Sequence, residues 1–515
     1  MSTVPEIIVV GGGIAGMTYA TQLADRAGRR PVRIRILSKA VVQVSNSFQA
    51  QGGVAAVMRG DDSFEDHVRD TLVAGAGRND EAVVRLVVRE GPALIRGLIG
   101  LGAHFDRGTD GALRLAREGG HSTARVVHHR DRTGEEIVRV LQRRVELMPA
   151  IEVLSDQRAI DLIISGEGAD RRCIGVRAVD LRTGDVTDRF AHLVVLATGG
   201  AGRMYEHTTN PQGASGDGIA MGIRAAALTR DMAFVQFHPT ALHTGAHGTV
   251  SLVSEAVRGA GARLLGADLR PLMRGVHPMG DLAPRNVVAR AIHREMMHAG
   301  VPHVWLDAGP IGVERFAQEF PGIALACRAH GLLPGRDLLP VMPAVHYMCG
   351  GLRTDDRGRT SIPGLFALGE CAGSGVHGAD RLASNSLLEA LVIPKRAAEI
   401  TWDEISGTPV LPSRIIRRDR LAKRPVEVVD RAMAALTHTM TKHVGIIRTE
   451  HGLQHSLRAI NRISRQVQPI WERRRWTTAL MDLRDLLVVA RAVAEAALNE
   501  PESVGAHCWE VEPVS

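Results

Sequence analysis

Near the start of the chain, Gly11-Gly12-Gly13-Ile14-Ala15-Gly16 has the spacing G-x-G-x-x-G. It follows the apolar run EIIVV and precedes a helical pattern from Met17 to Ala27. In such a turn the glycines let the backbone approach a pyrophosphate, and the helix N-terminus supplies amide donors and a favourable dipole. The motif predicts a dinucleotide site, although a purely structural glycine turn also explains these residues.

The residue expected to contact the ribose in this dinucleotide-binding motif is unusual here. An acidic residue is expected roughly 20 positions after the glycines, but this chain has Ser38-Lys39 at that place. The chain has only four lysines among many arginines, so a compact ammonium could be required at Lys39 to contact phosphate or ribose oxygens. A chance surface lysine remains the alternative.

Other candidate residues lie in four separated segments, FHPTAL with His238, LAPRNVVARA with Arg285, PAVHYMCGG with His346 and HGADRLASNSLLE with Arg381. The planar fork of arginine matches a carboxylate, and each charge-assisted hydrogen bond contributes about 1.5–3 kcal/mol. Two arginines and two histidines together would suit a dianion such as a four-carbon dicarboxylate. Taken singly, each of these residues is better explained as structural or exposed than as catalytic.

The elements that must position these residues suggest an α/β fold. EIIVV and VRIRIL flank the helical pattern as a strand–helix–strand unit, and the glycine-ended runs in HLVVLATGGAG and GLFALGECAG are expected to be strands of the same sheet. A His-, Pro- and Gly-rich segment interrupts this pattern, and helical patterns dominate after Pro412. We therefore predict a nucleotide-binding domain from 1–233 and 345–410, an inserted domain at 234–344 and a C-terminal helical domain at 411–515.

Composition excludes several classes of function. The formal charge is +7, but the arginines are dispersed and aromatic residues make up 3%, which argues against a nucleic-acid-binding surface. No window of about 18 residues is continuously apolar, as a membrane span would be. The first residues lack a basic signal-peptide segment, and the five cysteines have neither CxxC nor zinc-like spacing. We expect a cytoplasmic, reduced protein without a structural metal.

The motifs GGGIAG, LSKA, SNSFQAQGG, ATGGAG and LGECAG occur in the order and spacing of the succinate dehydrogenase/fumarate reductase flavoprotein family, which the chain resembles over nearly its whole length. The resemblance implies a Rossmann-like FAD-binding domain with an inserted α+β capping domain and a C-terminal helical domain. It also implies that SNSFQAQGG, which by composition is only a polar loop, lies against the flavin and diphosphate.

Respiratory members of this family attach the flavin covalently to a histidine in that loop. Asn46 takes this place here, so FAD is expected to be held non-covalently. The remaining loop contacts that the resemblance implies are Ser47, Phe48, Gln49, Ala50, Gln51, Gly52 and Gly53. Further implied FAD contacts are the carboxylates of Asp217 and Glu370 and, through the backbone, Ser386 and Leu387.

For the substrate, the resemblance implies that Arg381 and His346 bind one carboxylate and that His238 and Ser254 bind the other. Ser254 could equally be an ordinary helix cap. Arg285 matches the position of the family's proton donor or acceptor. Because an arginine side chain has a pKa above about 12, it is a poor base, and Arg285 is expected to stabilise charge during amine oxidation.

Glu118, in REGGHS, departs from the succinate- and fumarate-handling members, whose corresponding loop has an aromatic residue (RFGGM or PFGGQ). An added carboxylate would repel a plain dicarboxylate but would bind a substrate that also carries an ammonium. Such a contact, at about 1.5–3 kcal/mol, favours L-aspartate over succinate by roughly ten- to a hundredfold. A solvent-facing glutamate in a glycine loop is the alternative.

Asn46 and Glu118 together resemble the soluble branch of the family, which oxidises L-aspartate to iminoaspartate. That resemblance implies hydride transfer to FAD, reoxidation by O2 with release of H2O2 or by fumarate, and transfer of the product to quinolinate synthase in NAD biosynthesis. Two alternatives remain open, namely a fumarate reductase or succinate dehydrogenase flavoprotein subunit and a non-catalytic FAD-binding redox module.

Overall fold

The computed structural model describes residues 4–406, 414–422, 427–474 and 476–510. Its centre is a five-stranded sheet in which every pair of neighbouring strands is parallel. Across the sheet the strands are β19 (Leu365–Ala367), β10 (Leu193–Leu196), β1 (Glu6–Val10), β2 (Arg33–Ser38) and β6 (Ile151–Ser155). The three glycine-ended segments predicted to share one sheet are thus adjacent strands β1, β10 and β19.

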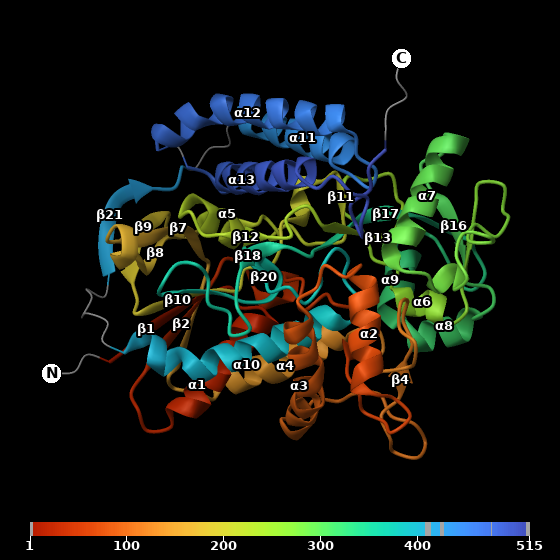
Figure 1. Cartoon of the computed structure of the whole chain (residues 1–515), viewed down its shortest axis with the longest axis horizontal. Coiled ribbons are helices and arrows are strands. Elements are labelled where there is room, and N and C mark those ends of the chain that lie inside the picture. Colours follow the sequence, from red (N-terminus) through yellow and green to blue (C-terminus); the bar gives the residue numbers. More distant parts are fainter. Residues whose placement is uncertain (1–3, 407–413, 423–426, 475, 511–515) are drawn as a thin grey trace.

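Both faces of this sheet are covered, which explains the continuous apolar runs of its central strands. Successive side chains point to opposite faces, so Val9 and Val195 join the hydrophobic cluster on one face. Val10 and Val194 join the cluster on the other face. The first face is covered by helices α1 (Ile14–Ala27), α3 (Glu81–Gly100), α4 (Thr133–Glu146) and α10 (Asn385–Ile405) (Figure 1).

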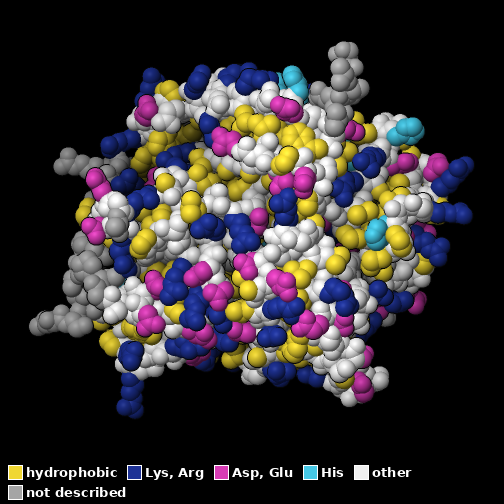
Figure 2. All heavy atoms as spheres, viewed as in Figure 1, with side chains coloured by type: hydrophobic (Ala, Val, Ile, Leu, Met, Phe, Trp, Pro, Cys, Tyr) yellow, Lys and Arg dark blue, Asp and Glu magenta, His cyan; other side chains and the backbone are white. Residues whose placement is uncertain are grey.

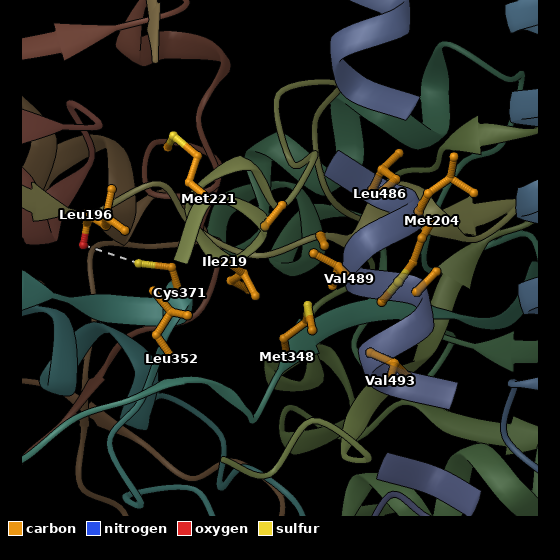
Figure 3. Close-up of a cluster of buried hydrophobic side chains, with 14 of the residues drawn as sticks. Leu196, Met204, Ile219, Met221, Met348, Leu352, Cys371, Leu486, Val489 and Val493 are labelled. Carbon is orange, nitrogen blue, oxygen red and sulfur yellow. Dashed lines mark hydrogen bonds between the residues drawn. The ribbon is translucent and has the colours of Figure 1, made fainter. Parts of the chain in front are cut away.

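The opposite face packs against an antiparallel sheet and two helices. The sheet consists of β7 (Gln157–Ser165), β8 (Arg172–Asp180), β9 (Asp185–Phe190) and β21 (Arg414–Arg420). The helices are α5 (Asp217–Arg224) and α13 (Thr478–Leu498). Figure 3 shows Val489 and Val493 of α13 beside Met204 in this cluster.

The inserted segment carries its own small core around an antiparallel pair, β13 (Val235–Leu242) with β17 (Leu339–Met348). The other strands of this sheet are β11 (His207–Thr208), β14 (Gly248–Thr249), β15 (Arg263–Leu265) and β16 (Val304–Asp307). The helices beside it are α6 (Glu255–Gly259), α7 (Arg285–Ala299), α8 (Val313–Glu319) and α9 (Pro321–Arg328) (Figure 1). The inserted segment was predicted to end at residue 344, but strand β17 continues past this residue to Met348.

The C-terminal region is mainly helical, with α11 (Glu427–His443) and α12 (Glu450–Glu472) packed on α13 (Figure 1). One strand, β21, lies within the region predicted to be helical, because it adds to the edge of β9. The limits of the three domains stay a prediction.

Small elements complete the framework around the site. They are α2 (Phe64–Ala74) and the short strands β3 (Val54–Ala55), β4 (Leu115–Ala116), β5 (Val126–Val127), β12 (Thr229–Arg230), β18 (Gly351–Arg353) and β20 (Ala372–Gly373). The sheet β3-β5-β4 connects the loop before Val54 with the loop after Ala116, since β5 pairs with both outer strands. These two loops hold Asn46 and Glu118.

The distribution of surface charge and the state of the cysteines can be compared with the expectations from composition. Figure 2 shows basic and acidic side chains interspersed over the face in view. All five cysteines are buried and free. Within the described ranges, no helix has the length and apolar composition needed to cross a membrane, and no group of three or more His, Cys, Asp or Glu side chains is arranged to hold a metal ion.

Candidate active site

The glycine turn between β1 and α1 leaves no room for side chains at its ends. Gly11 has a φ of 113°, and a Cβ there would lie 2.2 Å from the carbonyl oxygen of Ala197. A Cβ at Gly16 would lie 2.1 Å from the carbonyl oxygen of Gly11. At the start of the helix, Ile14 N donates a hydrogen bond of 3.1 Å to Ser47 Oγ. The turn is therefore packed against the SNSFQAQGG loop.

A cavity of 130 Å³ lies beside this turn and is lined by Gly11, Gly12, Gly13, Ser38, Lys39 and Asp217, among others. Lys39 Nζ donates to Ser215 Oγ and to Asp217 Oδ2, at 2.9 Å each. The other oxygen of Asp217, Oδ1, is buried and accepts no hydrogen bond from the residues that the structure describes. A buried carboxylate oxygen without a partner suits a ligand hydroxyl, such as that of a ribose.

A second cavity, of 560 Å³, shares Gly13, Asn46 and Ser47 with the first as lining residues. Phe48, Gln49, Ala50, Gln51, Gly52 and Gly53 line only this larger cavity, as do Ala15, Glu370, Ser386 and Leu387. All of the predicted cofactor residues except Ile14 and Gly16 therefore line two cavities that meet at Asn46. This arrangement fits an elongated dinucleotide with its phosphates near the glycine turn and its ring in the larger cavity.

Two further side-chain oxygens in the larger cavity bear on this fit. Gln51 Oε1 is buried and has no hydrogen-bond partner in the described part of the chain. Glu370 Oε1 accepts a hydrogen bond of 3.1 Å from Met348 N, and burial raises the pKa of this carboxyl to about 7. Both side chains can therefore offer polar atoms to a bound ring system.

The two predicted histidines face one another in the larger cavity, with ring centroids 5.2 Å apart. Burial, reinforced by nearby Arg285 and Arg381, holds the pKa of both rings well below its usual value, so both are neutral. His238 Nδ1 accepts a hydrogen bond of 3.2 Å from Thr240 N. Its proton is therefore on Nε2, which can donate to a ligand.

The two predicted arginines line the same cavity and are both buried. Arg285 Nε donates to Glu255 Oε2 at 2.7 Å. Arg381 Nη1 donates to Ser386 Oγ at 3.0 Å, and its guanidinium carbon lies 4.6 Å from the centre of the Tyr347 ring. Burial and the charge of Arg285 lower the pKa of Arg381 to about 10, which still leaves it charged at neutral pH.

Ser254 is a helix cap whose position in the cavity wall also suits the predicted contact with a substrate. It is the N-cap of α6, where its Oγ accepts a hydrogen bond of 3.3 Å from Ala256 N. It also lines the larger cavity. Because the cap uses only a lone pair of the oxygen, the hydroxyl proton remains available to a ligand.

Glu118 is buried in this cavity, with 3% of its surface exposed, so it does not face solvent. Ser384 Oγ donates to Glu118 Oε2 at 2.6 Å. Burial and the neighbouring Glu255 raise the pKa of Glu118, while Ser384 and the nearby arginines lower it by less. The structure thus brings all six predicted substrate-site residues to one cavity, lined also by the predicted ring-binding loop.

Other residues that contact this group were not predicted from the sequence, namely Gln236, Glu255, Tyr347, Thr209 and Ser384. Three lie close in sequence to predicted residues: Gln236 precedes His238 by two residues on a strand, Glu255 follows Ser254 directly, and Tyr347 follows His346 directly. Side chains two apart on a strand share a face. The contact of Ser384 with Glu118 had no signal in the sequence, because the two residues are 266 positions apart.

Residues 6–387 match the FAD binding domain family, and residues 433–512 match the C-terminal family of fumarate reductase flavoproteins. Over 98% of its length the chain is 41% identical to the L-aspartate oxidase of Streptomyces coelicolor, and it covers 88% of that protein. The identity to the L-aspartate oxidase of Pseudomonas aeruginosa is 37%, over 98% of this chain and 94% of that protein. The chain belongs to the L-aspartate oxidase family.

Solved structures of related flavoproteins have the same fold as this chain. A quinol fumarate reductase of E. coli superposes with a TM-score of 0.88 at 27% identity, covering 99% of this chain and 92% of that chain. Sdh1 of Mycobacterium smegmatis gives a TM-score of 0.81 at 30% identity, covering 99% and 89%. The predicted family and fold class are confirmed.

Proposed function

We propose that the chain oxidises L-aspartate to iminoaspartate in the larger cavity, with FAD as a non-covalent cofactor. The observation that carries this proposal is the burial of Glu118 among two arginines and two neutral histidines. The arginine and histidine donors together suit the two carboxylates of a four-carbon diacid. The extra carboxylate suits an ammonium, and L-aspartate is the diacid that carries one at Cα.

The residues around the two cavities would hold FAD along its length. The glycine turn, Lys39 and Asp217 would bind the diphosphate and ribose, and the loop from Ser45 to Gly53 would contact the ring. When bound, FAD supplies the acceptor for the hydride that leaves Cα of the substrate. Asn46 has no nucleophilic atom suited to a covalent bond with the ring, which supports a dissociable cofactor.

For the substrate, Arg381 and His346 would bind one carboxylate, and His238 and Ser254 would bind the other. His238 donates through Nε2–H and Ser254 through its hydroxyl, so the second carboxylate meets neutral donors. Fixing both ends of a four-carbon molecule aligns its Cα with the cofactor. Such alignment replaces a bimolecular encounter by a unimolecular step, with effective molarities that reach about 10⁵–10⁸ M in model reactions.

Glu118 and Arg285 would act on the reacting carbon from their positions in the cavity wall. Glu118 holds the amine, and its raised pKa makes it a better proton acceptor than a carboxylate in water. Arg285 would balance the negative charge of the bound diacid near the reacting carbon, since a guanidinium stays protonated and is a poor base. Its hydrogen bond to Glu255 fixes its orientation.

We further infer that O2, giving H2O2, or fumarate accepts the electrons at the end of each turnover. Iminoaspartate would pass to quinolinate synthase, which places the reaction at the first step of de novo NAD biosynthesis, in the cytoplasm. Fumarate reduction is a second candidate activity, supported by the likeness to quinol fumarate reductase. The buried Glu118 argues against a plain diacid as the main substrate, because it adds a negative charge to the pocket.

The test is a product measurement under air with purified, FAD-loaded protein. We expect consumption of L-aspartate to match formation of H2O2 one to one, with D-aspartate and succinate giving little. Adding fumarate under anaerobic conditions should sustain oxidation of L-aspartate and form succinate. Peroxide formation from succinate but none from L-aspartate would overturn the proposal.

A further inference from the structure

The carboxamide of Gln236 lies between the two arginines of the larger cavity. Gln236 is on β13 with 1% of its surface exposed. Its Oε1 accepts hydrogen bonds from Arg285 Nη1 at 3.1 Å, from Arg381 Nε at 3.2 Å and from Arg381 Nη2 at 3.0 Å. One neutral oxygen therefore joins both guanidiniums that we assign to the substrate.

The orientation of this carboxamide follows from its neighbours. A guanidinium has only donors, so the oxygen must face the arginines. On the other side, Gln236 Nε2 donates to Asp380 Oδ1 at 2.6 Å and to the carbonyl oxygen of Arg381 at 2.8 Å, and both of these atoms are acceptors. The amide thus fixes the backbone and the side chain of Arg381 together.

The neutrality of Gln236 matters because the charges around it are already partly balanced. Glu255 bonds to Arg285 and lies 3.3 Å from Arg258 Nη2, so its charge is shared between two arginines. Arg381 contacts the Tyr347 ring and Ser386, neither of which is a carboxylate. A glutamate at position 236 would bond directly to Arg285 and Arg381 and would compete with the substrate for their charge.

We propose that Gln236 is a positioning residue that holds Arg285 and Arg381 side by side while leaving their positive charge available to a dicarboxylate. Its amide oxygen accepts hydrogen bonds from Nη1 of Arg285 and from Nε and Nη2 of Arg381. Because the amide is neutral, it does so without adding negative charge to the site. The role in L-aspartate turnover rests on the proposed function. The role in binding a dicarboxylate does not require turnover and can be measured separately.

The decisive variant is Gln236→Glu, which keeps the size of the side chain and adds one negative charge. A carboxylate between two guanidiniums forms stronger hydrogen bonds than an amide. Its second oxygen, however, would face two acceptors, Asp380 Oδ1 and the carbonyl oxygen of Arg381, so we expect a lower melting temperature. We also expect succinate to bind the FAD-loaded protein at least about tenfold more weakly, because like charges placed together are strongly unfavourable. The KM for L-aspartate should rise by a similar factor, with a smaller change in kcat.

Two further variants separate charge from packing. Gln466→Glu makes the same charge change on the exposed face of α12 and should leave succinate binding as in the wild type. Gln236→Met removes the acceptor without adding charge, so the melting temperature should fall. Weaker succinate binding in Gln236→Glu than in Gln236→Met, with both melting temperatures below that of the wild type, would support the proposal.

The proposal is overturned if Gln236→Glu binds succinate as tightly as the wild type. It is also overturned if Gln236→Glu and Gln236→Met lose melting temperature and succinate binding equally, since that result indicates packing alone. Failure of the proposed function would be distinct, because the wild type would then bind succinate without oxidising L-aspartate.

Discussion

Replacing Glu118 with glutamine removes a buried negative charge while keeping the size of the side chain and its contact with Ser384. In the wild type, Ser384 Oγ donates to Glu118 Oε2, which leaves Oε1 for a ligand. The amide of the variant can still accept from Ser384. It would bind an ammonium less strongly than a carboxylate does, because the charge-assisted bond becomes a neutral one.

The expected loss follows from that change in bond type. Hydrogen bonds between charged groups contribute about 1.5–3 kcal/mol and neutral ones about 0.5–1.5 kcal/mol. Removing the charge at a site that is 3% exposed should therefore lower kcat/KM for L-aspartate by roughly tenfold or more. Binding of succinate, which has no ammonium, should be equal to or tighter than in the wild type, since a like charge has been removed.

The assay compares steady-state oxidation of L-aspartate with succinate affinity and with reduction of fumarate by artificially reduced protein. Glu146→Gln, on the exposed end of α4, is the matched control and should change none of the three. We expect fumarate reduction to survive largely in Glu118→Gln. Equal losses of L-aspartate oxidation and fumarate reduction would refute the assignment of Glu118 to the amine.

Three further outcomes are expected. Arg285→Leu should abolish L-aspartate oxidation with FAD still bound, as seen in the flavin absorbance, and near-normal turnover would remove Arg285 from the catalytic residues. After denaturation the flavin should separate from the protein, because Asn46 stands where a tether would be; a fluorescent protein band on a denaturing gel would contradict this. The pKa of Glu118 is raised above 4.5, and only its ionised form binds ammonium strongly. The KM for L-aspartate should therefore rise as the pH falls through that raised pKa. A KM that stays constant across that range would argue against an ionised Glu118 at the amine.

Part of the fold was predictable because its strands carry strong local patterns. The run EIIVV is buried on both faces, and the glycines after β1, β10 and β19 mark where each strand ends. The edge strand β6 (Ile151–Ser155) was missed, since its residues are half-buried or exposed and lack a continuous apolar run. The strand β21 was missed because it extends the antiparallel sheet through the edge of β9, which lies far away in the sequence.

In the site, too, some residues could be predicted from the sequence and others could not. His238, Arg285, His346 and Arg381 lie in segments whose motifs resemble a known family, so they could be named from the sequence alone. Their support depends on contacts between distant positions, such as Gln236 with Arg381 across 145 residues. No local pattern reports such a pairing, which forms only when β13 and the start of α10 are brought together.

The most direct test of the account is anaerobic mixing of the FAD-loaded protein with L-aspartate or succinate, followed by flavin absorbance. We predict that L-aspartate bleaches the flavin band rapidly, that succinate does so far more slowly, and that Glu118→Gln narrows the difference between them. Bleaching by succinate as fast as by L-aspartate, or no bleaching by either, would contradict the claim that a buried carboxylate in a cationic pocket selects an amino diacid.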